Sequence, residues 1–288
     1  MESAIAVRSQ VIYGGLTMWL KTGAIAALVG FLYASVVVDL AAEWWTQPEA
    51  SHGILIPPFA LYIVYLGRRS TLSIVPHPDW RGLGLTFLAC LILLMGQLAS
   101  EFFLSRISLI FLIGGLIWTF WGVERLRSLA FPLILLATMV PLPAIVYNTA
   151  AAPLQLFAST LATDLAQTLG VSIYRDGNVI HLANASLGVE EACSGLHSLS
   201  ALVVASLLLG FLEQAAILGR VLLFVLSVPL AIAVNVVRVT GTALLADYRL
   251  EYAMGFYHSF SGWLVFVLGF GTLWLVGKLL FRMRRANP

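Results

Sequence analysis

The chain has 288 residues, of which 60% are hydrophobic and 10% are charged, and its formal net charge is +2. Soluble domains carry about 25% charged residues, so this chain cannot cover a water-soluble particle of its size, and its apolar surface must face lipid. The small net charge does not indicate nucleic-acid binding, and no long polar stretch remains for a soluble domain. We therefore expect a single membrane domain over residues 1–288.

A transmembrane helix needs about 20 mostly apolar residues, and the hydropathy pattern predicts about eight of them in an all-α polytopic fold. The first apolar run is not followed by a small-residue cleavage site, so we interpret it as a retained helix. The second span is short and contains Pro57-Pro58, which favours a kinked or partly re-entrant helix. The predicted spans cover residues 22–40, 53–67, 82–99, 105–122, 129–147, 195–212, 220–246 and 259–281.

The distribution of Lys and Arg predicts the sidedness, because cytoplasmic loops collect basic residues. With eight spans and a cytoplasmic N-terminus, most of the 16 basic residues fall in inside segments, and Arg238 lies within a span. The opposite orientation would reverse this distribution, so we expect both termini in the cytoplasm. The inside residues are Arg8, Lys21, Arg68, Arg69, Arg81, Arg125, Arg127, Arg220, Lys278, Arg282, Arg284 and Arg285, and the outside residues are Arg106, Arg175 and Arg249.

One long external segment, 148–194, contains two predicted elements. Residues 153–169 form an amphipathic helix with Pro153 in its first turn and Gly170 at its C-terminal cap. We expect this helix to lie on the membrane surface rather than to form a ninth span. Asp176-Gly177 between two β-rich runs in 171–182 predicts a short β-hairpin. The apolar face of the helix comprises Leu154, Phe157, Leu161, Leu165 and Leu169, and Gln155, Ser159, Thr163 and Gln167 avoid it.

Cys193 is the first candidate catalytic residue. It follows Glu190-Glu191-Ala192, where the external segment enters the sixth predicted span. A thiol at a helix N-terminus experiences the positive end of the helix dipole, which favours the nucleophilic thiolate, and the two glutamates oppose this effect. A cysteine in a membrane protein is more often a small apolar residue, and that interpretation fits Cys90 in the third span. The two cysteines do not indicate a disulfide framework or a dithiol motif.

Arg238 and His258 are predicted to lie at the same outer edge of the membrane as Cys193. Arg238 follows Arg220 by 18 residues, which is about 27 Å of helix rise, and Asn235 shares its helical face. His258 begins the eighth span on the outer side. A nucleophile, a proton carrier and a fixed cation for a developing oxyanion are the parts of a thiol acyl-transfer site. The alternative is that Arg238 snorkels or forms a structural ion pair.

Two further histidines are weaker candidates. His197 lies four residues after Cys193 on the same helical face, and it rivals His258 as the base. His52, within Ser51-His52-Gly53 at an outer helix start, is a candidate for substrate binding together with His197 and Asn235. No pair of His and Glu residues has the spacing of helical metal ligands, so we expect no metal site.

Three blocks of this sequence resemble the exosortase/archaeosortase family, and the resemblance covers nearly the whole chain. Ser51-His52-Gly53 and the following apolar run with Pro57 resemble the family's N-terminal block. The family's cysteine, arginine and histidine map onto Cys193, Arg238 and His258, and histidine at the third position matches the bacterial members. The three blocks are Gly177-Asn178-Val179-Ile180 with Glu191-Ala192-Cys193-Ser194-Gly195-Leu196, then Asn235-Val236-Val237-Arg238, and finally Tyr257-His258.

The resemblance implies a cysteine peptidase or transpeptidase in the inner membrane, with its active site facing the periplasm. Such an enzyme acts on secreted proteins that end in a Pro-Glu-Pro-like (PEP-CTERM) motif, a transmembrane helix and a basic tail. Cys193 would form a thioester, which an amine, a hydroxyl or water resolves, so the protein is transferred or released without a cofactor. The expected partners are these substrate proteins and membrane lipid, and not nucleic acid.

Two other classes of protein stay open. A transporter or channel would use Arg238 as a substrate counter-ion, and it would have paired broken helices at the membrane midplane. The sequence shows no such pair. A membrane scaffold for exopolysaccharide export would have no chemistry of its own, and a thiol-reactive probe on the purified protein would separate both classes from the enzyme.

Overall fold

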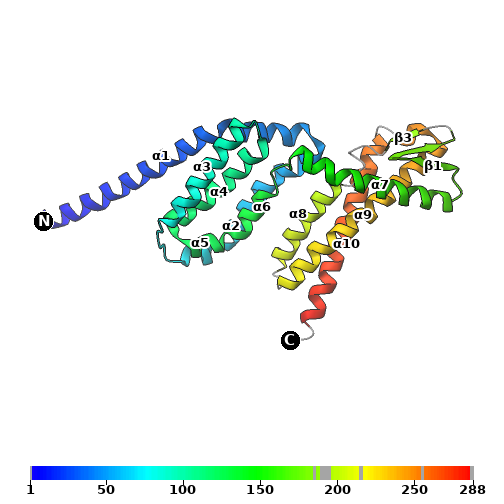
Figure 1. Cartoon of the computed structure of the whole chain (residues 1–288). Coiled ribbons are helices and arrows are strands. Elements are labelled where there is room, and N and C mark those ends of the chain that lie inside the picture. The colour runs from blue at the N-terminus through cyan, green and yellow to red at the C-terminus, as the bar shows by residue number, and fades with distance from the viewer. Residues whose placement is uncertain (1, 184–185, 189–195, 214–216, 254–255, 286–288) are drawn as a thin grey trace. The chain divides into compact units, whose positions relative to one another are not determined.

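The computed structural model of the chain describes residues 2–183, 186–188, 196–213, 217–253 and 256–285 (Figure 1). Helices make up most of the described chain, with one small three-stranded sheet, which confirms the predicted all-α polytopic membrane fold. Contacts divide the chain into two compact units. The first comprises Met1–Glu43 and Ser70–Ser128, and the second comprises Trp44–Arg69 and Leu129–Pro288. The single membrane domain stays a prediction.

Six segments of the described helices are long and apolar enough to cross a membrane, and each overlaps a predicted span. The sixth predicted span forms α8 (Leu196–Leu212), whose apolar part is shorter. The six segments are Gly23–Thr46 in α1 (Glu2–Thr46), Ala50–Ser73 across η1 (Pro48–Leu55) and α2 (Ile56–Ser73), Arg81–Leu98 (α3), Phe102–Trp121 (α4), Ile217–Tyr248 (α9) and Phe260–Leu280 within α10 (Phe256–Arg285).

The fifth predicted span, residues 129–147, is not one helix. α6 (Ala130–Ala137) ends after eight residues, and α7 (Ala144–Thr168) begins only after a non-helical stretch. Pro141 and Pro143 explain the break, because proline has no backbone N–H and disfavours a helical conformation in the residue before it. Hydropathy does not register this backbone effect, so the prediction of a single span over residues 129–147 was wrong.

In the first unit, α3 and α4 form a helical hairpin whose two helices approach each other closely at glycine residues. A Cβ on Gly82 would lie 2.4 Å from the backbone nitrogen of Thr119, and one on Gly115 would lie 2.6 Å from Thr86 Oγ1. α1 packs on this hairpin through a hydrogen bond of 2.9 Å between Tyr33 Oη and Ser108 Oγ. α5 (Val123–Ser128) follows α4.

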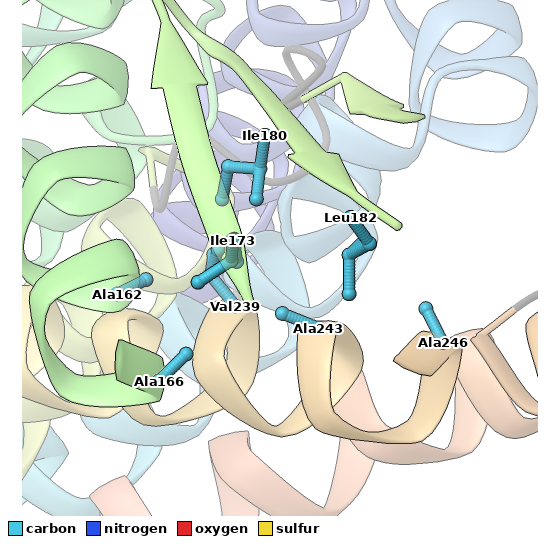
Figure 2. Close-up of a cluster of buried hydrophobic side chains, with 8 residues drawn as sticks. All are labelled: Ala162, Ala166, Ile173, Ile180, Leu182, Val239, Ala243 and Ala246. Atoms are coloured by element: carbon cyan, nitrogen blue, oxygen red, sulfur yellow. The ribbon is translucent and has the colours of Figure 1, made fainter. Parts of the chain in front are cut away.

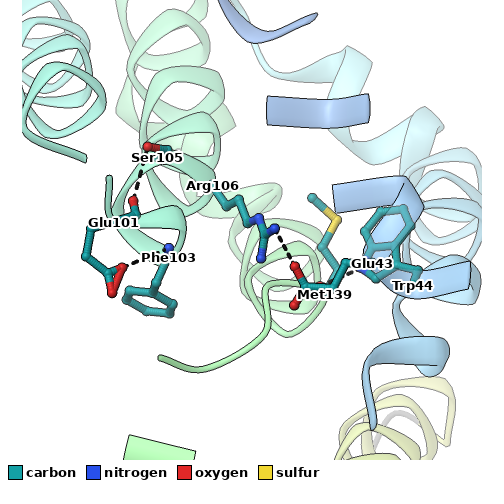
Figure 3. A network of polar contacts seen from close by, with 7 residues as sticks. All are labelled: Glu43, Trp44, Glu101, Phe103, Ser105, Arg106 and Met139. Carbon is teal, nitrogen blue, oxygen red and sulfur yellow. Dashed lines mark hydrogen bonds and ion pairs between the residues drawn. The ribbon is translucent and has the colours of Figure 1, made fainter. Parts of the chain in front are cut away.

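An ion pair between a buried arginine and a half-buried glutamate joins α1 to α4 in the same unit. Arg106 is only 6% exposed, and its guanidinium binds the carboxylate of Glu43 (Figure 3). Glu101 caps α4 by accepting a hydrogen bond from the Phe103 backbone N–H at 3.2 Å. Removing either partner of a buried ion pair leaves an uncompensated charge, so this pair fixes the end of α1 against α4.

In the second unit, α8, α9 and α10 pack together around an apolar cluster. The close approach of α10 to its neighbours depends on Gly269, where an added Cβ would lie 3.2 Å from Leu202 and 3.5 Å from Val234. α9 continues through Pro229 as a helix of 32 residues. The buried members of the cluster are Leu202 and Ala205 of α8, Leu223 and Ala231 of α9, and Leu273 of α10.

The predicted hairpin is present, and it belongs to a sheet in the order β1-β2-β3 (Figure 1). The strands are β1 (Ile173–Asp176), β2 (Val179–Leu182) and β3 (Ser186–Gly188), all antiparallel. Gly177 opens the two-residue turn with φ +61°, a conformation that glycine adopts without steric cost. The inner face of the sheet packs on α7 and α9 (Figure 2). The sequence did not predict β3, which is only three residues long.

The predicted amphipathic helix is longer than expected. α7 begins at Ala144, so Pro153 lies inside the helix and not in its first turn. Its small residues Ala162 and Ala166 are fully buried against α9 and the sheet, whereas Phe157 is 50% exposed. The predicted apolar face of α7 therefore points away from the core of the second unit, as a lipid-facing surface would. Its position on the membrane surface stays a prediction.

Candidate active site

Arg238 lies where α9 passes from the helical bundle to the sheet. Ala231, two turns before it, belongs to the cluster with α8 and α10, and Val239, directly after it, belongs to the cluster with α7 and the sheet. Arg238 itself is half-buried. Arg238 is thus placed at the boundary between two apolar clusters, and not in the middle of either.

The guanidinium of Arg238 lies against α10 at Gly262. A Cβ added to Gly262 would lie 3.3 Å from Nη2, 3.4 Å from Cζ and 3.7 Å from Nε of Arg238. The glycine therefore leaves the space that the flat face of the guanidinium occupies. We refer to this contact as the arginine seat.

His258 occupies α10 one turn before the arginine seat. It precedes Gly262 by four residues, and residues at this spacing lie on the same face of a helix. The structure therefore brings the backbone position of His258 to the turn next to Arg238, although the two are 20 residues apart in the sequence. The side chain of His258 is outside the described part of the structure.

Asn235 lies on α9 one turn before Arg238, as the sequence predicted, and is only 1% exposed. Its side-chain amide is therefore surrounded by protein atoms and does not reach the surface of the protein. On the other side of Arg238, the Thr242 hydroxyl donates to the Arg238 carbonyl oxygen at 2.9 Å. Binding of substrate by Asn235 stays a prediction.

Cys193 lies outside the described residues. β3 ends at Gly188 and α8 begins at Leu196, so the intervening chain connects the sheet to the bundle. His197 belongs to the first turn of α8, and its side chain is also outside the described part. α8 packs against α9 and α10, which carry Arg238 and the backbone position of His258.

The N-terminal block with His52 belongs to η1, which contacts α8. His52 is half-buried. A Cβ on the neighbouring Gly53 would lie only 2.2 Å from Nε1 of Trp44, and this same indole N–H donates to the Met139 carbonyl oxygen at 3.0 Å (Figure 3). Trp44 therefore holds together η1 and the chain that follows α6.

Sequence reasoning missed Trp44 and Gly262. The spacing of Gly262, four residues after His258, is a signal that could have identified it. Among the residues that the structure describes, no group of three His, Cys, Asp or Glu side chains is placed to hold a metal ion. The expected lack of a metal site stays a prediction.

These features define a multi-pass membrane protein in which a half-buried arginine, a histidine-bearing helix and a small sheet meet. A family model described as "Transmembrane exosortase (Exosortase_EpsH)" matches residues 44–275, which is most of the chain. The chain therefore belongs to the transmembrane exosortase family, whose members are generally membrane-embedded sorting peptidases or transpeptidases. No curated protein and no solved structure matches the chain.

Proposed function

We propose that this chain is a cysteine transpeptidase that processes secreted proteins at the outer face of the inner membrane. In this proposal Cys193 is the nucleophile, Arg238 stabilises the oxyanion and His258 carries the proton. The observation that supports it best is the arginine seat, because it joins Arg238 to the helix turn next to His258. All three residues lie within the matched range 44–275.

The chain length limits how far Cys193 can lie from the arginine and the histidine. Cys193 is three residues from Leu196 at the start of α8, and three residues span at most about 11 Å. α8 in turn packs against both α9 and α10. The covalent tether thus keeps the thiol near the end of the bundle from which α8 starts.

The proposed reaction has two acyl-transfer steps. The Cys193 thiolate attacks the carbonyl carbon of the scissile peptide bond, and Arg238 donates hydrogen bonds to the oxyanion. The C–N bond breaks as His258 gives a proton to the leaving amine, which departs on the C-terminal helix of the substrate. An amine, hydroxyl or water then attacks the thioester, His258 accepts its proton, and the thiolate is released.

The other polar residues have supporting roles in this proposal. Asn235, buried one turn before Arg238, acts as a positioning residue for the guanidinium. His197 is the alternative base, because it follows Cys193 by four residues. His52 contributes to the substrate-binding surface, since η1 contacts α8.

The proposed substrates are secreted proteins with a short Pro-Glu-Pro-like motif, an apolar helix and a basic tail. A nucleophile at the outer membrane edge reaches only peptide bonds held at that depth, and the residues just before a transmembrane helix are always presented there. With both termini cytoplasmic, the basic tail of the substrate lies on the same side as the basic termini of this chain, as expected for cytoplasmic segments.

The test uses a reporter protein with this tripartite C-terminus, expressed with the wild-type enzyme and with Cys193→Ala. We expect a C-terminal mass loss only with the wild-type enzyme, and a hydroxylamine-sensitive adduct on Cys193 when acceptors are limiting. Cys90→Ala is the matched control, because Cys90 lies on the exposed surface of α3, and it should process normally.

The position of the motif gives a second readout. Moving the motif outward by about ten residues should abolish processing, because an extended segment of that length spans roughly 33 Å. Replacing the substrate helix by another apolar helix of equal length should preserve processing. Efficient cleavage of the displaced motif, or cleavage by the Cys193→Ala enzyme, would refute the proposed function.

A further inference from the structure

The small sheet has one strand edge whose backbone groups can be assigned from its pairing. Asp176 and Val179 close the two-residue turn, and such a closing pair exchanges both backbone hydrogen bonds. Because bonded and non-bonded pairs alternate, Ile180 points its N–H and C=O away from β1, toward its partner Leu187. On β3, Leu187 therefore bonds to β2, whereas Ser186 and Gly188 point their N–H and C=O toward the open edge.

The opposite edge of the sheet supports this assignment and is already in use. The alternation requires the Ile173 carbonyl to point away from β2, and it accepts a hydrogen bond of 2.8 Å from Gln167 Nε2 of α7. β1 is thus partly covered by α7. In the described part of the chain, no strand pairs with β3 on its outer side.

The outer face of the sheet carries a continuous row of side chains that ends at this open edge. Tyr174 stacks on His181, with ring centroids 4.7 Å apart, and His181 Nδ1 and Ser186 Oγ form a hydrogen bond of 2.8 Å. These three residues are direct cross-strand neighbours. The row fixes the side chain of Ser186, so β3 keeps a defined conformation although it is short.

We infer that the substrate's extended segment, the residues just before its transmembrane helix, adds to the sheet as a fourth strand along β3. This inference rests on the proposed function. Strand addition needs an open edge with outward backbone groups, and it gives affinity through main-chain hydrogen bonds. Ser186 and Gly188 provide such groups at a spacing of two residues, which is the repeat of a β-ladder.

The chain order explains why this edge suits the reaction. Cys193 follows Gly188 by five residues, so the nucleophile is tethered within about 17 Å of the strand edge. A substrate strand held along β3 has its peptide bonds extended and its direction fixed. Main-chain binding also requires few particular side chains, so the same edge accommodates different substrate proteins.

The first test removes a donor from the open edge without disturbing the pairing of β2 with β3. Gly188→Pro deletes an outward N–H, and Gly188→Ala is the matched control that keeps it. We expect Gly188→Pro to process the reporter about tenfold more slowly than Gly188→Ala, a ratio that corresponds to about 1.4 kcal/mol and lies within the range that one hydrogen bond contributes. Labelling of Cys193 by a small maleimide should be equal in both variants.

The second test maps the register by disulfide formation in a Cys90→Ala, Cys193→Ala background. Ser186→Cys and Gly188→Cys are each paired with single cysteines at each of the ten reporter residues before its helix. Strand addition predicts that cross-links to 186 and to 188 form at reporter positions two residues apart. Arg175→Cys, on the edge next to α7, is the control and should give few cross-links.

The outcomes separate this inference from the proposed function. Cys193-dependent processing with no fixed register, or with equal rates for Gly188→Pro and Gly188→Ala, overturns strand addition and leaves the transpeptidase proposal standing. Processing that persists in Cys193→Ala overturns the proposed function itself. A fixed register with slow Gly188→Pro supports both.

Discussion

The arginine seat predicts that Gly262→Val disables the enzyme through Arg238. Valine places its methyl groups about 1.5 Å beyond Cβ, and the Cβ of residue 262 would already lie 3.3 Å from Arg238 Nη2 and 3.4 Å from Cζ. Ordinary contact between these heavy atoms requires about 3.5–4.0 Å, so the guanidinium must move by about 1 Å or more. A displacement of this size can lower a rate about 100-fold, and we expect that loss in kcat.

Gly271→Val is the matched control, because Gly271 lies in the same helix with nothing within 4 Å of an added Cβ. It carries the same β-branched penalty and should retain normal processing. Rates of reporter cleavage by purified protein in nanodiscs, with melting temperatures, separate activity from folding. If the loss acts through Arg238, Gly262→Val should add little in an Arg238→Ala background. Normal turnover of Gly262→Val, or full additivity with Arg238→Ala, would refute the reasoning.

Arg238→Lys should insert and fold normally, but its turnover should fall by a factor of about 10²–10³, because an ammonium cannot provide the two aligned donors of a guanidinium. Near-wild-type turnover would make Arg238 a structural residue. In a Cys90→Ala background, Cys193 should react with a membrane-impermeant maleimide added to cells with a permeabilised outer membrane, and labelling only after the inner membrane is breached would overturn the proposed sidedness. Gly53→Ala should lower the free energy of unfolding by roughly 1–3 kcal/mol, because the added Cβ would lie 2.2 Å from Trp44 Nε1. Thermal melting should show this loss. It should show no loss for the control Gly30→Ala, where nothing lies within 4 Å of an added Cβ.

The helices were largely predictable because a membrane imposes one strong requirement on them. Backbone groups in lipid must be satisfied internally, so long apolar runs become helices, as in the six confirmed segments. The segment 129–147 has the same hydropathy but contains Pro141 and Pro143, and proline acts through the backbone. Pro153 shows the opposite error, because the sequence placed it in the first turn of a helix whereas α7 continues through it.

For the candidate site, the sequence predicts only the level of each residue along the membrane, and this level stays a prediction. Spacing along α9 and α10 gives the height of Arg238 and His258, and the structure places the guanidinium one turn from the His258 position. Spacing along a helix does not give the rotation of that helix about its own axis relative to a neighbouring helix. The chain has 24 glycines. The spacing of Gly262 from His258 makes it a candidate, and the packing shows that it lies beneath Arg238.

In the proposed reaction, the sheet has a physical role that the helices cannot fill. Helices in lipid bond their own backbone groups, so the described helices of the bundle offer an extended peptide no continuous row of main-chain donors and acceptors. A membrane enzyme that cuts beside its substrate's transmembrane helix therefore benefits from a strand edge at the level of its nucleophile. Here the sheet packs on the end of α9 that starts at Val239, directly after Arg238, so the same helix supports both the proposed oxyanion donor and the proposed peptide-binding edge.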